Sequence, residues 1–147
     1  MPASRSNAPT ALPLALTDRV ELLGRVSPER IRAELSAAAA FVLPSLQENA
    51  PMAISEALAA GVPVIASNLC GMPHMILEGK TGFLVDPQDV RGIADRLVRL
   101  LSDDRLQREM GTAAHAYALE RFHPMAVAAK TRAVYEQVIR EHRLGRA

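Results

Sequence analysis

The fold of this chain is decided by one stretch of its sequence, Pro44-Ser-Leu-Gln-Glu-Asn-Ala-Pro-Met-Ala-Ile-Ser-Glu-Ala-Leu-Ala-Ala-Gly-Val-Pro-Val-Ile-Ala-Ser67. Immediately before it, the apolar run Phe41-Val-Leu43 predicts a short buried strand. Pro51 is a favoured first residue of a helix and Gly61 a favoured stop, so a helix is expected between them. The next run, Pro63-Val-Ile-Ala66, is again fully apolar and predicts a second buried strand. Short apolar strands separated by helices indicate a parallel sheet that is covered on both faces.

The sequence before this stretch predicts one further strand and one further helix. Residues 20–23, Val-Glu-Leu-Leu, form a strand candidate that ends at Gly24. The run Ser27-Pro28-Glu29 has the residue types expected at a helix N-cap and first turn, so a helix is predicted from there through Ala39. Residues 1–17 hold only a weak apolar segment without a convincing cleavage site, and we expect a disordered leader there. A single domain over residues 18–147 is expected to follow it.

The sequence after the deciding stretch predicts a last strand and three helices. A turn-rich passage over residues 67–80 leads to Thr81-Gly-Phe-Leu-Val85, the last strand candidate. Beyond it the chain is expected to be helical, with a second helix beginning at Ser102 or Asp103 and a final one over about residues 124–142. The predicted order βαβαββααα describes an α/β fold: a partial Rossmann-like parallel sheet with flanking helices and a helical C-terminal tail.

Composition excludes several classes of function. The chain has 147 residues, enough for one domain that buries roughly 70% of the surface its unfolded chain exposes. Aromatic residues make up 3% with no Trp, and the net charge is +1, so no nucleic-acid partner is expected. The single cysteine, Cys70, excludes an internal disulfide and indicates a reducing compartment. No apolar run approaches the roughly eighteen residues that a membrane-spanning helix needs.

Two glutamates in the deciding stretch are the candidate functional residues. Glu48 lies in the predicted loop and Glu56 within the predicted helix, with seven residues between them. In open α/β sheets, ligands bind in the crevice beyond the carboxyl ends of the strands, and this loop lies there. The helix that Pro51 begins presents a partial positive charge suited to a phosphate, while carboxylates suit the hydroxyls of sugars. A nucleotide-sugar has hydroxylated rings at both ends and phosphates between them, so it would satisfy all three features.

The two glutamates also have other interpretations. Carboxylates around a helix start are usually a solvated face and a capping charge. A small α/β hydrolase could use Glu48 and Glu56 as an acid/base pair, as glycosidases use two carboxylates. The spacing alone leaves these alternatives open.

The same stretch resembles the donor-site signature of the family-four (group 1) glycosyltransferases, which adopt the GT-B fold. The shared pattern is Pro-Ser-x-x-Glu…Glu-Ala-x-Ala-x-Gly-x-Pro-Val, matched from Pro44 to Val64. Residues 20–29 resemble the family's strand-Gly-x-Val-helix entry, and Gly71-Met-Pro73 and residues 79–87 resemble its two downstream loops. The similarity covers about residues 18–142 and corresponds to the C-terminal donor-binding domain.

The resemblance implies a role for each matched residue. Glu48 would be the catalytic residue and would contact the hydroxyls of the donor sugar, and Glu56 would hold the nucleotide ribose. The other implied donor-binding residues are Asn49, Ala50, Pro51 and Met52, whose backbone amides would approach the sugar and diphosphate, and Gly24, Arg25 and Val26, which would lie near the base. Two positions depart from the family pattern: Asn-Ala-Pro replaces a Gly-Phe-Gly loop, and His74 stands where Glu is frequent.

The implied activity is that of a retaining, metal-independent glycosyltransferase that uses a nucleotide-diphosphate sugar as donor and no cofactor. The acceptor is not implied, but the pathway would be glycan, polysaccharide or glycolipid biosynthesis in the cytoplasm, with weak association of the basic terminal helix with the inner membrane face. Only residues 1–17 precede the matched region, so the acceptor domain and the phosphate-binding Arg and Lys of whole enzymes are expected to be missing. The alternative is a catalytically inactive nucleotide-sugar-binding fragment or regulatory module.

Truncation would leave two apolar surfaces uncovered, residues 20–23 and the stripe Val127, Val134, Val138 and Ile139 on the last helix. Exposed apolar patches favour association. The expected protein partner is therefore either a second copy of the chain or the missing N-terminal acceptor domain.

Overall fold

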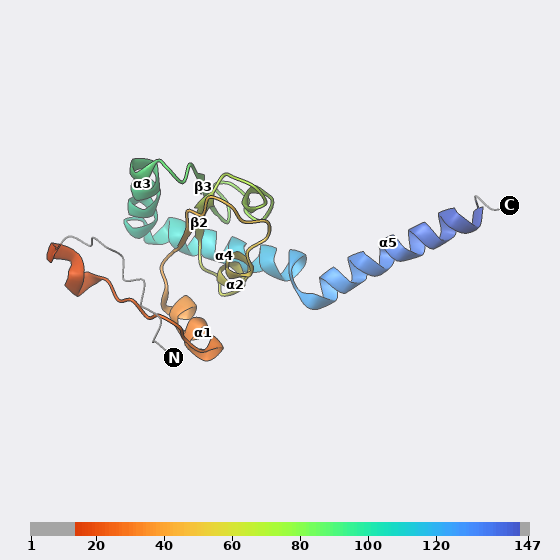
Figure 1. Cartoon of the computed structure of the whole chain (residues 1–147), viewed down its shortest axis with the longest axis horizontal. Coiled ribbons are helices and arrows are strands. Elements are labelled where there is room, and N and C mark those ends of the chain that lie inside the picture. The colour runs from red at the N-terminus through yellow and green to blue at the C-terminus, as the bar shows by residue number, and fades with distance from the viewer. Residues whose placement is uncertain (1–13, 145–147) are drawn as a thin grey trace, which may run out of the picture.

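The computed structural model describes residues 14–144, and its centre is a three-stranded parallel sheet (Figure 1). The strands are β1 (Phe41–Leu43), β2 (Val64–Ser67) and β3 (Gly82–Val85), and they lie side by side in that order. In the register, Phe41 is opposite Val64, and Val64 is opposite Gly82. The structure therefore confirms the predicted α/β fold with a parallel sheet.

Within residues 14–144, five α-helices surround and extend this sheet (Figure 1). They are α1 (Pro28–Ala37), α2 (Met52–Ala59), α3 (Val90–Leu101), α4 (Asp104–Arg121) and α5 (Pro124–Leu144), with two short 3₁₀ helices, η1 (Leu14–Arg19) and η2 (Met72–His74). Side-chain caps fix several of their starts. The Ser27 hydroxyl accepts a hydrogen bond from the backbone N–H of Arg30, as the predicted N-cap requires. Asp103 caps α4 in the same way, accepting from Leu106 at 2.9 Å.

The central strand is buried because each face of the sheet has its own hydrophobic cluster. Val64 and Ala66 point into one cluster, where α2 and α4 contribute Ile54, Leu58 and Ala114. Ile65 points to the opposite face and packs with residues of β3, α3 and α4, which are Phe83, Val85, Leu100 and Met110. The all-apolar sequence of β2 follows from this two-sided burial.

The predicted strand at residues 20–23 is not formed. These residues have an irregular backbone, and Leu22 is 62% exposed. Among the described residues, β1 pairs only with β2, and no strand forms backbone hydrogen bonds with residues 20–23. A short isolated strand is not stable without such hydrogen bonds, so the segment stays irregular. The expected leader over residues 1–17 lies largely outside the described residues, and its part from Leu14 onward belongs to η1.

The last helix projects away from the rest of the molecule (Figure 1). In α5 only Ala126 is half-buried, while the described side chains beyond it are exposed. The predicted stripe is uncovered along its length, with Val134, Val138 and Ile139 each at least half exposed. Among residues 14–144, no helix has both the length and the apolar character needed to cross a membrane.

Candidate functional site

The candidate site lies where the loops after β1 and β2 meet, beyond the carboxyl ends of these strands. The backbone N–H of Gly71 donates a hydrogen bond to the carbonyl of Glu48 at 3.0 Å, which ties the two loops together. The N–H of Asn68 donates to the carbonyl of Val85 at 2.9 Å, so the start of the second loop is also held to the end of β3. Parallel strands bring these carboxyl ends to one edge of the sheet, where open α/β folds bind ligands.

Gly71 is required by the close approach of these two loops. A Cβ atom built on Gly71 would lie 1.4 Å from the carbonyl oxygen of Asn49. The backbone φ of Gly71 is −86°, so the requirement is one of space rather than of a left-handed conformation. The Gly71-Met-Pro73 motif of the sequence therefore has a structural cause that the sequence pattern did not reveal.

The start of α2 faces the same loops. Pro51 is its N-cap, with an extended backbone, and no side chain caps the helix there. The first N–H groups of a helix have no partner within the helix. Such a terminus stabilises negative charge close to it. The loop with Asn-Ala-Pro is thus still followed by a helix start without a side-chain cap, although it lacks the glycines common in the family.

The structure distributes the predicted donor residues over the two sides of α2. Asn49, Ala50 and Met52 line a pocket of about 410 Å³ together with Gly71 and His74. Glu48 is half-buried and Pro51 is the N-cap of α2, and neither is among the residues that line this pocket.

Glu56 instead lines a second pocket, of about 510 Å³, formed between α1 and α2. Pro28, Ile31 and Leu35 of α1 supply its apolar wall. The predicted base-side residues Gly24, Arg25 and Val26 come directly before α1, whose first residue Pro28 lines this pocket. The structure therefore places Glu56 in a pocket with α1 and not in the pocket of Asn49 and Met52, and Gly24, Arg25 and Val26 line neither pocket.

Arg121 is a pocket residue that sequence analysis missed. It is the last residue of α4 and lines the 410 Å³ pocket together with Asn49. No motif links α4 to this loop in the sequence. The packing of α4 against α2 is what brings Arg121 there, and it depends on contacts distant in sequence.

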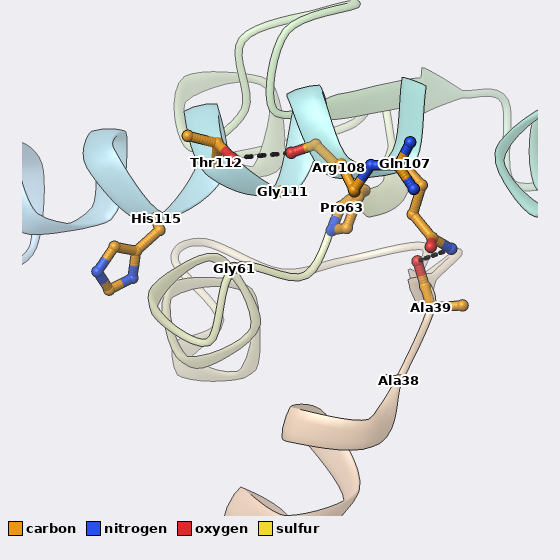
Figure 2. Close-up of a pocket in the computed structure, with 9 residues that line it drawn as sticks. All are labelled: Ala38, Ala39, Gly61, Pro63, Gln107, Arg108, Gly111, Thr112 and His115. Carbon is orange, nitrogen blue, oxygen red and sulfur yellow. Dashed lines mark hydrogen bonds between the residues drawn. The ribbon is translucent and has the colours of Figure 1, made fainter. Parts of the chain in front are cut away.

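A third pocket, of about 520 Å³, lies at the other end of the strands, where β1 and β2 begin (Figure 2). Two of its polar side chains are bonded to main-chain carbonyls: Gln107 donates to Ala39 at 3.2 Å, and the Nδ1 atom of His115 lies 2.6 Å from the carbonyl oxygen of Ala59. Gly111 allows α4 to approach Gly61, since a Cβ there would lie 2.4 Å from the Gly61 carbonyl oxygen. We interpret this pocket as a structural joint between α4, the end of α2 and the strand starts.

The resolved pKa shifts belong to Glu29 and Arg105, neither of which lines either candidate pocket, although Glu29 is next to Pro28 at the edge of the 510 Å³ pocket. The pKa of Glu29, at the start of α1, is lowered mainly by a hydrogen bond from the backbone N–H of Glu29 itself and secondly by one from the Ser27 hydroxyl. A hydrogen bond from Arg105 to the Glu109 carboxylate raises the pKa of Arg105. Over residues 14–144, no group of three or more His, Cys, Asp or Glu side chains is placed to hold a metal ion.

Comparison with known proteins defines the class of this molecule. Residues 10–117 match the family described as "Glycosyl transferases group 1", and the chain belongs to this family. It is 32% identical over 133 residues to the N-acetyl-alpha-D-glucosaminyl L-malate synthase of Bacillus anthracis, covering 90% of this chain and 34% of that protein. It is 37% identical over 122 residues to the D-inositol 3-phosphate glycosyltransferase of Corynebacterium diphtheriae, covering 83% of this chain and 28% of that protein. The chain thus spans about a third of the length of these relatives.

Solved structures show the same relationship. The sucrose-phosphate synthase of Thermosynechococcus elongatus superposes with a TM-score of 0.77 at 32% identity, over 86% of this chain and 32% of that one. The HepE protein of Anabaena, solved in complex with UDP, superposes with a TM-score of 0.75 at 23% identity, over 84% of this chain and 34% of that one. The C-terminal domain of a group 1 glycosyltransferase from Francisella tularensis gives 0.64 at 25% identity, over 69% of this chain and 53% of that domain. The fold is that of the GT-B glycosyltransferases.

Proposed function

We propose that this chain binds a nucleotide-diphosphate sugar and forms the donor-binding part of a retaining glycosyltransferase. The observation that supports it most directly is the junction of the two loops, where Gly71 holds the carbonyl of Glu48 beside the uncapped start of α2. This junction occurs in a chain that belongs to the group 1 glycosyltransferases. A relative of the same fold was solved with UDP bound, which is consistent with a nucleotide-containing donor.

The roles that we propose follow the two pockets. Glu48 would accept hydrogen bonds from hydroxyls of the donor sugar, and the backbone of Asn49 to Met52 would approach the sugar and diphosphate. Glu56 would accept hydrogen bonds from the ribose in the pocket between α1 and α2, whose half-enclosed apolar wall suits the flat face of a sugar or base. The segment Gly24 to Val26 would lie near the base.

The charge of the leaving diphosphate would be stabilised by protein groups, in a metal-independent reaction. Helix termini and basic side chains placed where charge develops are a general means of lowering such a barrier. An exposed helix N-terminus supplies only about 0.3–1 kcal/mol. The proposal therefore requires further cations beside α2, within this chain or in the acceptor domain of a complete enzyme.

The acceptor and pathway are proposed only as classes. The relatives are named for different acceptors, among them D-inositol 3-phosphate and L-malate. We propose transfer in glycan, polysaccharide or glycolipid biosynthesis in the cytoplasm, with the basic α5 able to contact the inner membrane face. An inactive nucleotide-sugar-binding module is the second candidate, because one helix terminus supplies too little charge stabilisation for rapid turnover.

Calorimetric titration of the chain with UDP-glucose and GDP-mannose tests the proposed binding. Replacing Glu56 by Gln removes a charged acceptor while keeping the shape, and a hydrogen bond to a charged group contributes about 1.5–3 kcal/mol. We expect at least tenfold weaker binding for Glu56→Gln and unchanged binding for Glu120→Gln, an exposed glutamate on α4. Equal affinity of wild type and Glu56→Gln would contradict the assignment of Glu56.

An assay of donor hydrolysis and sugar transfer separates the enzyme from the binding module. Sugar transfer that is lost in Glu48→Gln while donor binding persists supports a catalytic role for Glu48. Donor binding without turnover supports the module.

A further inference from the structure

The 410 Å³ pocket, lined in part by the loop of residues 48–51 (the donor loop), contains two basic residues that the family pattern does not supply. His74 comes from η2 and Arg121 from the end of α4, and both line the 410 Å³ pocket with Asn49, Ala50 and Met52. No carboxylate lines this pocket. Two segments that are distant in sequence, η2 and the end of α4, therefore bring nitrogen donors to this pocket, and no Asp or Glu lines it to neutralise their charge.

The donors of Arg121 are not used by the protein itself. Among residues 14–144, the ion pairs link other arginines to glutamates within single helices, and none of them includes Arg121. The guanidinium carbon lies 5.9 Å from the ring centroid of Tyr117 and 6.0 Å from that of Phe122, at the outer limit of a cation–π contact. Its planar N–H groups remain available to a ligand.

His74 is held in place through its backbone rather than its ring. Its N–H donates to the carbonyl of Gly71 at 3.1 Å, so it is fixed to the same residue that holds the donor loop. Within the described part of the chain, its imidazole takes part in no hydrogen bond with the protein. A ring nitrogen on this side chain can therefore donate to a ligand in the pocket.

We propose that Arg121 and His74 bind a phosphate group of the ligand, namely the diphosphate of the nucleotide-sugar, in the 410 Å³ pocket that they share with the donor loop. A guanidinium matches phosphate geometry with two parallel hydrogen bonds, and a histidine ring adds a third donor. The pair supplies, from within this chain, the positive charge of the Arg121 guanidinium and a further N–H donor from His74, which would stabilise the leaving group. This assignment rests on the proposed function, because it takes the diphosphate from the donor described there.

Arg121 has an alternative structural role that the experiment must separate. A cation in the last turn of a helix stabilises it through the helix dipole, and Arg121 occupies that position in α4. If the role of Arg121 is purely structural, Arg121→Gln should lower the unfolding temperature of the ligand-free chain and leave phosphate binding unchanged. If Arg121 binds phosphate, Arg121→Gln should weaken phosphate binding and leave that unfolding temperature unchanged.

The test is calorimetric titration of the full chain with pyrophosphate, UDP, GDP and uridine. We expect Arg121→Gln to weaken binding of pyrophosphate and of the better-bound nucleotide by roughly tenfold or more, and His74→Gln by about threefold. Uridine contains no phosphate, so its affinity should not change. Arg108→Gln is the matched control, since Arg108 is an exposed arginine of the same helix that lines the pocket at the other end of the strands.

Each outcome bears on the proposal separately from the proposed function. Nucleotide binding that Arg121→Gln leaves intact overturns the assignment while the donor-binding function stands. Pyrophosphate binding that depends on Arg121, without any binding of nucleotides or nucleotide-sugars, supports the phosphate site and overturns the donor function. Absence of binding of every probe to the wild type overturns both. If Arg121→Gln does not fold, Arg121→Lys, which keeps the charge but loses the planar fork, should show a smaller loss of pyrophosphate affinity, and an unchanged affinity overturns the proposal.

Discussion

The strand–helix–strand unit from β1 to β2 and the projecting α5 both contain large apolar side chains, but these side chains have opposite surroundings, and α5 contains more charged residues. In the unit, Ile54 and Leu58 are completely buried between the sheet and α4. In α5, an apolar stripe of comparable residues stays in solvent (Figure 1). The difference shows that apolar periodicity predicts which face of a helix or strand is apolar. Whether that face is buried depends on whether another element of the chain packs against it.

The largest expected effect comes from truncating the same residue type in both regions. Ile54→Ala should lower the free energy of unfolding by about 2–5 kcal/mol, because it opens a cavity in a closely packed core. Ile139→Ala, on the half-exposed face of α5, should change it by less than about 0.5 kcal/mol. Urea unfolding in dilute solution measures both, and similar losses would show that α5 is packed against something.

Two glycines, Gly71 at the loop junction and Gly24 with open space around it, should respond differently to replacement by alanine. Gly71→Ala must push the two loops apart, and we expect it to cost about 3 kcal/mol and to weaken donor binding strongly. Gly24 has a φ of +61° with nothing within 4 Å of a built Cβ, so Gly24→Ala should cost only the backbone strain, about 1–2 kcal/mol. Thermal unfolding and nucleotide titration of the two variants measure the contrast. Intact donor binding by Gly71→Ala would contradict the proposed role of the junction.

The third prediction asks what covers the α5 stripe. Its exposed valines and the exposed residues 20–23 favour association. We therefore expect a dimer at micromolar concentration, measured by light scattering during size-exclusion chromatography. Val138→Lys should restore a monomer, while Ala129→Lys, on the opposite side of α5 at 3.6 residues per turn, should not.

A monomer with a cooperative unfolding transition at high temperature would contradict this prediction. It would mean that the stripe is tolerated in water, and that the contrast between the two regions does not lead to association.

How far the sequence predicted the fold depended on whether the signals were local. Caps such as Ser27 and the apolar run of β2 act within a few residues or within one sheet, and the structure confirms them. The strand expected at residues 20–23 failed because pairing is not local. In the common doubly wound order 3-2-1-4-5-6, the third strand pairs with the second and not with the fourth. If β1 is the fourth strand of that order, residues 20–23 cannot pair with it.

The candidate site also combines features that local sequence signals predict with features that depend on contacts between distant segments. The motif predicted the loop and helix that contain Glu48 to Glu56, because these residues follow one another along the chain. It did not predict that Gly71 would contact the carbonyl of Asn49, nor that Arg121 would reach the loop from α4. Both depend on how separate elements pack, and a single sequence contains no short-range signal for either.

The smallest expected effect is a pH dependence at the start of α1, a helix with no fully buried residue. Its own backbone N–H and the Ser27 hydroxyl lower the pKa of Glu29 in the folded chain. A carboxyl group with a lowered folded pKa stabilises the fold above its unfolded pKa of about 4.3, and this contribution is lost as pH falls through the folded value. Glu29→Gln should therefore be slightly less stable than the wild type at pH 7, and the difference should disappear once the pH falls below the lowered pKa of Glu29 in the folded chain. Thermal unfolding at pH 7 and over a series of acidic pH values measures this, with Ser36→Ala near the end of α1 as a control whose effect should not depend on pH. A difference that persists undiminished at low pH would mean that Glu29 acts through its packing rather than through its charge.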